Sequence, residues 1–396
     1  MNVLLCPLSD PGFRYPALAV GLELRRRGHT VRVLAPGGAA GPLPPGLDPA
    51  ATAGPEDATA FRVGNWFRYG AAQYRAVREA ARRTRADALV TSVLCHGALL
   101  AAETLDLPVA VLGLAAHLWP YAAGGQGEPE RPALRAWRLH ETLGHYARAR
   151  EDAGLPPRRD RAPERPLTGD ALLLRGHPAF EYPGAELPER IHRVGPCWWE
   201  PAPDPADLAT LADLDARIAR CGKPLVYVHH GRSFGGSSLW PWLNAAFTGG
   251  PYQAVVETGR SGPARPAPGA DLLPVRHPWM TPLITRATAV VASGTTAPVL
   301  AALLTARPLL LHPAGGEQPL LTEACLRAGV AHRAPADPAA APTALDAART
   351  DPALRARTTA VGDWLRRSPG PPAAATLIES LSHPTPAVSP AGTLTG

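Results

Sequence analysis

The chain has 396 residues, of which 45% are hydrophobic, 19% charged and 6% aromatic, and its formal net charge is +6. These values exclude a chain that is disordered over most of its length, and the length favours two domains over one. Lys223 is the only lysine, and the many arginines are spread along the chain. A nucleic-acid partner would require basic residues gathered on one face, so we expect none.

The cysteines and the first residues indicate where the protein works. The five cysteines are scattered without CxxC spacing, which predicts a reducing cytoplasm and neither a disulfide framework nor a zinc site. The opening MNVLLCPL lacks the basic segment and the long apolar run of a signal peptide or a membrane span. We therefore expect a first strand here and no membrane partner.

The N-terminal half alternates apolar strands with amphipathic helices. Residues 2–8 predict a strand, 16–28 a helix with Pro16 in its first turn, and 30–36 a second strand. This βαβ unit favours a parallel sheet with a right-handed crossover. The alternation continues with a helix at 69–84, a strand at 86–92, a helix at 97–105 and a strand at 108–114. Gly and Pro interrupt the helical pattern over 124–170, as suits segments that line a pocket.

A second alternating series follows a Pro- and Asp-rich linker at 200–207 and the helix behind it. Strands are predicted at 224–230, 253–258, 272–277, 288–293 and 308–313, and helices at 237–247, 297–306 and 319–328. The sequence therefore predicts an N-terminal domain (1–200), a linker and helix (201–221), a C-terminal domain (222–382) and a disordered tail (383–396). Two doubly wound domains of this kind bind ligands at the carboxyl ends of their strands.

A small polar loop lies at one of these strand ends. Ser293, Gly294, Thr295 and Thr296 separate a strand from the first turn of a helix, where free N–H groups and the helix dipole favour an anion. Gly294 would let a phosphate approach the backbone. The alternative is a tight strand-to-helix turn capped by a hydroxyl.

The next strand ends in a second polar loop that faces the same crevice. Glu317 and Gln318 supply a carboxylate and an amide suited to adjacent sugar hydroxyls. Taken singly, they also fit a polar helix start with an acidic residue near its N-terminus. The two loops together fit one extended ligand.

Longer segments resemble a known family. RHPWMTPLITRATAVVASGTT and ARPLLLHPAGGEQPLLTEACLRAGVA are similar to the donor-binding half of GT-B glycosyltransferases of the UDP-glycosyltransferase type, especially actinobacterial enzymes that decorate natural products with deoxysugars. LLCPLSDPGFRYPALAVGLELRRRGHTVRVLAP resembles the family's opening strand and Gly-His-x-x-Pro loop, and HRVGP its strand before the linker. The resemblance implies an α/β GT-B fold in which two Rossmann-like domains, the first for the acceptor and the second for the donor, face a central cleft.

The resemblance also implies an activity. The family transfers a sugar, here expected to be a deoxysugar, with inversion from a dTDP- or UDP-linked donor to a hydrophobic or aromatic acceptor. We expect no metal and no further cofactor, and we allow for a homodimer. The diphosphate would contact His230 or Arg232, and the base would lie near Pro278 and Trp279. The expected acceptor site contains Trp66, Phe67, Trp119, Tyr121 and Trp137.

The family's catalytic base is missing. Phe13 stands where the family has its His or Asp, Ser92 replaces the Asp that orients the His, and Ser293 replaces a His of the donor loop. Asp10, on the same loop as Phe13, and His96 are the candidate replacements. Asp10 also fits an Asx-type turn before a proline. His117 and His145 lie in the acceptor region, where a histidine is more often structural.

The missing base leaves other functions open. One is a catalytically inactive homologue that binds an NDP-sugar or assists an active transferase. Another is an epimerase of the same fold, although that reaction needs more carboxylates and cations around the sugar than Glu317 offers.

Overall fold

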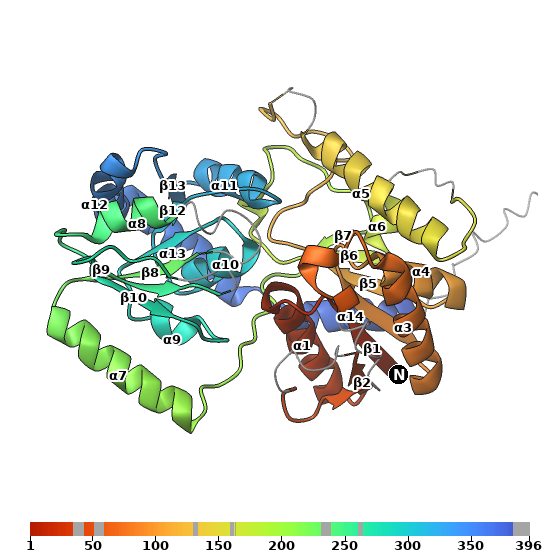
Figure 1. Ribbon diagram of the computed structural model, residues 1–396. Helices are drawn as coiled ribbons and strands as arrows, with labels where there is room; N and C mark the ends of the chain where they lie inside the picture. Colours follow the sequence, from red (N-terminus) through yellow and green to blue (C-terminus); the bar gives the residue numbers. More distant parts are fainter. Residues whose placement is uncertain are drawn as a thin grey trace, which may run out of the picture.

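The computed structural model describes residues 1–34, 43–50, 59–129, 134–158, 162, 164–230, 239–259 and 264–382. These residues form two parallel β-sheets of seven and six strands, each covered by helices, and the two resulting domains lie side by side in Figure 1. Both sheets are doubly wound. The predicted GT-B architecture is therefore confirmed.

The first sheet has the strand order β3-β2-β1-β4-β5-β6-β7. Its central strands are buried on both faces, which explains their continuous apolar sequences. The order reverses between β1 and β4, and a ligand site is expected beside that point. The strands are β1 (Asn2–Cys6), β2 (Thr30–Val33), β3 (Asp48–Pro49), β4 (Ala88–Ser92), β5 (Val109–Leu112), β6 (Ala171–Leu174) and β7 (Ile191–Arg193).

The second sheet repeats this pattern with the order β10-β9-β8-β11-β12-β13. Here the reversal falls between β8 and β11, so the loop after β11 lies at the expected ligand site. The strands are β8 (Leu225–His229), β9 (Gln253–Glu257), β10 (Leu272–Val275), β11 (Ala289–Ala292), β12 (Leu309–Leu311) and β13 (Ala331–Arg333).

Helices cover the faces of both sheets. Those within the first domain are α1 (Pro11–Arg26), η1 (Val63–Asn65), α3 (Gly70–Thr84), α4 (His96–Leu105), α5 (Leu134–Asp152), α6 (Arg165–Thr168) and η2 (Pro178–Phe180). Those that follow are α7 (Pro205–Cys221), α8 (Leu239–Phe247), α9 (Thr281–Ile284), α10 (Thr296–Leu304), α11 (Gln318–Arg327), η4 (Pro338–Ala340), α12 (Ala341–Thr350), α13 (Pro352–Arg367) and α14 (Pro371–Ser382).

Helix α1 begins earlier than its sequence predicts. It starts at Pro11, so Pro16 lies inside the helix and not in its first turn. Proline has no N–H, and the carbonyl of Gly12 therefore cannot receive its helical hydrogen bond from residue 16. The guanidinium of Arg175 donates to this carbonyl instead, over 3.2 Å.

The last described helix returns to the first domain. Residues 222–382 are predicted as one domain, but α14 packs against α1 (Figure 1), and Ala374, Ala375 and Ile378 are buried in the core of the first sheet. Glu379 also pairs with Arg27 over 2.8 Å. The reason is the small apolar face of α14, which completes the cover of that sheet. The predicted tail, 383–396, lies outside the described residues.

The two domains are packed together beside the cleft. Ala115, Ala116 and Phe180 of the first domain belong to a core cluster of the second. Arg327 on α11 donates to the carbonyl of Phe180 over 2.8 Å. In the described part of the chain, every helix is too short or too polar to cross a membrane.

Candidate active site

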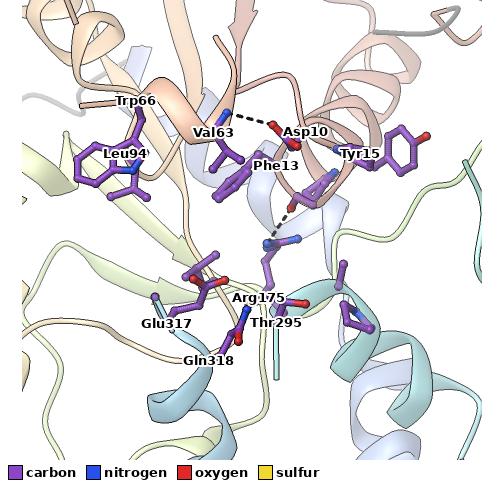
Figure 2. Close-up of a pocket in the computed structure, with 18 of the residues that line it drawn as sticks. Asp10, Phe13, Tyr15, Val63, Trp66, Leu94, Arg175, Thr295, Glu317 and Gln318 are labelled. Carbon is purple, nitrogen blue, oxygen red and sulfur yellow. Dashed lines mark hydrogen bonds between the residues drawn. The ribbon is translucent and has the colours of Figure 1, made fainter. Parts of the chain in front are cut away.

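A cavity of about 550 Å³ lies between the domains, at the carboxyl ends of both sheets. This volume is in the range of pockets that hold small molecules. Figure 2 shows the first turn of α1 on one side of the cavity, and Thr295 at the start of α10 and Gln318 at the start of α11 on the other. The cavity is thus lined by residues of both domains.

The wall formed by the first domain is mainly aromatic. Of the five aromatic residues predicted for the acceptor site, four line the cavity: Trp66, Phe67, Trp119 and Trp137. Tyr121 does not line it, and its hydroxyl donates to Glu181 over 2.8 Å. Such a wall favours a flat, apolar ligand.

The N-terminus of α10 opens into the cavity. Thr295 is its N-cap residue, but no side chain caps the helix, and the buried hydroxyl of Thr295 has no partner within the described structure. The hydroxyl of Thr296 accepts a hydrogen bond from the backbone N–H of Ala115 over 3.1 Å and so joins the domains. Unsatisfied N–H groups at such a terminus attract an anion.

Ser293 and Gly294 lie behind this terminus and do not line the cavity. Gly294 has φ +81°, and a Cβ there would lie 2.5 Å from Thr322 Oγ1 and 3.0 Å from the carbonyl oxygen of Gln318. Glycine is therefore needed so that the turn can pack on α11. This reason differs from the predicted one, the approach of a phosphate.

Glu317 and Gln318 line the cavity opposite the aromatic wall. The amide oxygen of Gln318 accepts the backbone N–H groups of Ala314 at 2.8 Å and Gly315 at 3.3 Å, which leaves its NH₂ group as the donor for a ligand. Burial raises the pKa of Glu317, and the charge of Arg138 opposes this shift. Arg138 belongs to α5 of the first domain and donates to the carbonyl of Gly316 over 2.7 Å.

His229 ends β8 and His230 follows it directly, and the two side chains point in opposite directions because successive side chains of an extended chain alternate. His229 lines the cavity, whereas the ring of His230 packs against Trp240 with centroids 5.1 Å apart. Burial and the neighbouring His312 lower the pKa of His230 to about 4. His229 therefore lines the cavity, and His230, the residue predicted to contact the diphosphate, does not. Arg232 lies outside the described residues.

Trp279, which was predicted to stack on the nucleobase, is part of the hydrophobic core. Trp279 is 1% exposed, and its indole N–H donates to Asp207 over 3.2 Å. His277 stacks on it with centroids 4.2 Å apart and an interplanar angle of 9°. His277 and Pro278 line the cavity and Trp279 does not. The ring available for stacking on a nucleobase is therefore that of His277, and Trp279 packs against the other face of this ring.

The candidate catalytic base Asp10 is the N-cap residue of α1 and lies close to Phe13 in the sequence. It is 5% exposed, lines the cavity and accepts the backbone N–H of Val63 through Oδ2 over 3.0 Å, as Figure 2 shows. Asp10 therefore fixes the loop before η1 and still borders the cavity. Ser92 has a structural role, because its hydroxyl accepts the N–H of Leu8 over 3.0 Å.

His96, the second candidate base, lies behind the aromatic wall. It is fully buried, its ring meets that of Trp66 edge to face at 5.3 Å, and it does not line the cavity. Burial and the nearby His145 lower its pKa to about 3, so it is neutral at physiological pH. His117 is buried as well, with its pKa lowered to about 3 by burial and by Arg135. Of these histidines, His145 lines the cavity.

Sequence reasoning missed several charged cavity residues, among them Arg175 and Glu257. Glu257 ends β9, and its carboxylate accepts the N–H of His277 over 2.9 Å. Arg175 directly follows β6. This short strand comes immediately after the helical pattern of 124–170, so it was not predicted. The run ALLLRG, an apolar strand that ends in a charged residue and a glycine, is the signal that could have revealed it. Among the described side chains, no group of three His, Cys, Asp or Glu residues is placed to hold a metal ion.

Comparison with known proteins places this geometry in context. No family model matches the chain. It is 30% identical over 164 residues to 4'-demethylrebeccamycin synthase of Lentzea aerocolonigenes, a stretch that spans 37% of this chain and 38% of that enzyme. The fold matches the glycotransferase of kitacinnamycin with a TM-score of 0.67 and 20% identity, over 96% of this chain and 98% of that one. It also matches the glycosyltransferase VinC, solved in complex with dTDP, with a TM-score of 0.62 and 15% identity over 96% and 99% of the two chains.

These matches agree with the sequence resemblance and with the paired sheets. The chain has the GT-B fold and resembles the actinobacterial glycosyltransferases that act on natural products.

Proposed function

We propose that the protein transfers a sugar, a deoxysugar by its resemblance, from a nucleoside-diphosphate sugar to a hydrophobic or aromatic natural product, with inversion at the sugar carbon. The observation that carries this proposal is the cavity between the domains, where the open N-terminus of α10 faces an aromatic wall. An anion-binding end and an apolar wall in one cavity suit a charged donor and an apolar acceptor.

The second domain supplies the groups for the donor. We assign the α10 terminus and Thr295 to the diphosphate, whose negative charge grows as the bond to the sugar breaks. Glu317 and the NH₂ group of Gln318 are assigned to the sugar hydroxyls, and His277 to the base. The dTDP bound by VinC supports a dTDP- or UDP-linked donor for this chain as well.

The first domain supplies the groups for the acceptor. Trp66 and Trp119 are assigned to the apolar body of the acceptor, and Asp10 to the proton of its hydroxyl. In-line attack from this side, opposite the diphosphate, inverts the sugar carbon.

Release of nucleoside diphosphate tests the proposal. Purified protein is incubated with a panel of dTDP- and UDP-sugars and aromatic acceptors, and both the diphosphate and the glycoside are measured. We expect the two products in equal amounts, and only when donor and acceptor are both present.

Phe13 in the place of the family's base favours a second candidate, an inactive homologue that binds the donor. Such a protein would gain thermal stability with a nucleoside diphosphate but would form no glycoside with any member of the panel. That pair of results would replace transfer by binding as the function.

A further inference from the structure

Arg175 is a buried cation on the floor of the cavity. Arg175 is 3% exposed, yet it belongs to the cavity lining. Its Nε donates to the carbonyl of Gly113 over 2.8 Å, and its Nη2 donates to the carbonyl of Gly12 over 3.2 Å. The two carbonyls fix the plane of the guanidinium, and its other N–H groups are not used by these bonds.

Arg175 has no acidic counter-ion among the residues that the structure describes. The titratable group that acts on it is Cys197, and burial raises the pKa of this thiol to about 12, so it is neutral at physiological pH. Burial lowers the pKa of Arg175 to about 10, which still leaves it charged. A buried charge of this kind is costly unless an anion compensates it.

The position of Arg175 in the cavity indicates which kind of anion it binds. Pro16 leaves free the Gly12 carbonyl that Arg175 binds. Phe13, which follows Gly12, stands where the family that the chain resembles has its base. Figure 2 shows Arg175 between the first turn of α1 and Thr295, between the acceptor side and the donor side of the cavity. A ligand that contacts both sides of the cavity would lie next to this charge.

We propose that Arg175 binds the acceptor's reacting oxygen as an oxyanion, and that the acceptor class is therefore a phenol. A phenol is acidic enough to ionise beside a guanidinium, and its ring fits the aromatic wall that includes Trp66 and Trp119. The inference rests on the proposed glycosyl transfer and explains how it proceeds without the family's histidine.

The reaction balances without any further reactant. The phenol loses its proton to solvent on binding, or to Asp10 when it binds protonated. The phenolate oxygen then forms a bond to the sugar carbon, and the bond from that carbon to the diphosphate oxygen breaks. The electron pair leaves with the nucleoside diphosphate.

The ionisation of a bound chromogenic phenol tests the inference without any sugar transfer. 4-Nitrophenol is titrated with protein in the absence of donor, and its absorbance reports the phenolate fraction. We expect wild-type protein to lower the pKa of the bound phenol by at least about one unit, equivalent to at least tenfold tighter binding of the phenolate than of the phenol. Arg175→Gln should abolish this preference, whereas Arg175→Lys should retain part of it. Arg193→Gln, an exposed arginine at the end of the neighbouring strand β7, is the matched control and should behave as wild type.

Several outcomes would overturn the inference. They are a wild-type protein that leaves the phenol unbound or its pKa unchanged, and an Arg175→Gln protein with the wild-type shift. Loss of dTDP and UDP affinity in Arg175→Gln, with phenol ionisation unaffected, would assign the guanidinium to the diphosphate instead.

Circular dichroism checks that each variant folds. If Arg175→Gln does not fold, a full wild-type shift of the phenol pKa in Arg175→Lys contradicts the proposal, and a reduced shift supports it. A shift without any glycoside formation would refute the transfer function and leave the oxyanion site in place.

Discussion

Asp10 has two roles that a single substitution can separate. Its Oδ2 accepts the N–H of Val63, and the carboxylate borders the cavity beside Phe13. In Asp10→Asn the amide oxygen can still accept that N–H, but the side chain no longer takes a proton. We therefore expect turnover with an alcohol acceptor to fall at least about 100-fold, while donor binding and thermal stability stay unchanged.

Steady-state kinetics with an alcohol and with an acidic phenol measure this effect, and Phe13→His serves as the control that retains activity. The loss should be smaller for the phenol, which ionises without help. An Asp10→Asn enzyme that is fully active on the alcohol would exclude Asp10 as the base.

Single residues show where sequence reasoning reaches its limit. The loops at Thr295 and Glu317 could be placed at the cavity because each follows an apolar strand. The prediction of Trp279 depended on the loop that follows β10, and that of His230 on which way a side chain points just after β8. Local sequence does not determine that direction, since it follows from how the strand sits in the sheet.

At the scale of elements, the N-terminus of α10 can be tested by two adjacent substitutions. Thr295→Val removes the unpartnered hydroxyl without removing a capping bond. We expect the affinity for nucleoside diphosphate to fall about 10- to 100-fold, as for a lost hydrogen bond to a charged group, with stability unchanged. Isothermal titration calorimetry with dTDP and UDP gives the measurement.

Gly294→Ala provides the contrast, because it acts on packing. The new Cβ would meet Thr322, and alanine would have to adopt the left-handed backbone conformation that Gly294 has, so the unfolding free energy should fall by about 1–3 kcal/mol. Equal affinity in Thr295→Val and wild type would show that the diphosphate does not bind at this helix end.

Most elements could be predicted because each shows its own period of apolar residues. The start of α1 could not, since a proline in the second turn normally indicates a helix boundary there. Here Arg175, distant in sequence, binds the carbonyl that Pro16 leaves free. The β6 strand was missed for a related reason: four apolar residues give too short a pattern to separate from the helical residues before them.

At the scale of the whole molecule, α14 joins the end of the described chain to the first sheet. Ile378 is 1% exposed in the core formed with α1. Ile378→Ala should therefore destabilise the first domain by about 2–5 kcal/mol, as is usual for a cavity in a well-packed core. Calorimetric unfolding, with and without dTDP to mark the donor domain, assigns the weakened transition.

Leu345→Ala, at a buried position in α12, is the matched control and should weaken the second domain. A first domain that keeps its stability in Ile378→Ala would show that α14 contributes little to its core. The two-sheet architecture itself could be predicted from the repeated strand–helix alternation. The return of α14 could not, because nothing in its sequence specifies which of two similar sheets it covers.

The crossing of α14 also has a consequence for the order in which the protein is built during synthesis. The first sheet leaves the ribosome early, but the helix that covers part of it is made only after the entire second domain. Until then, the apolar surface that receives Ile378 remains open to water and to other nascent chains. The half of the protein that is translated first is thus the half that matures last.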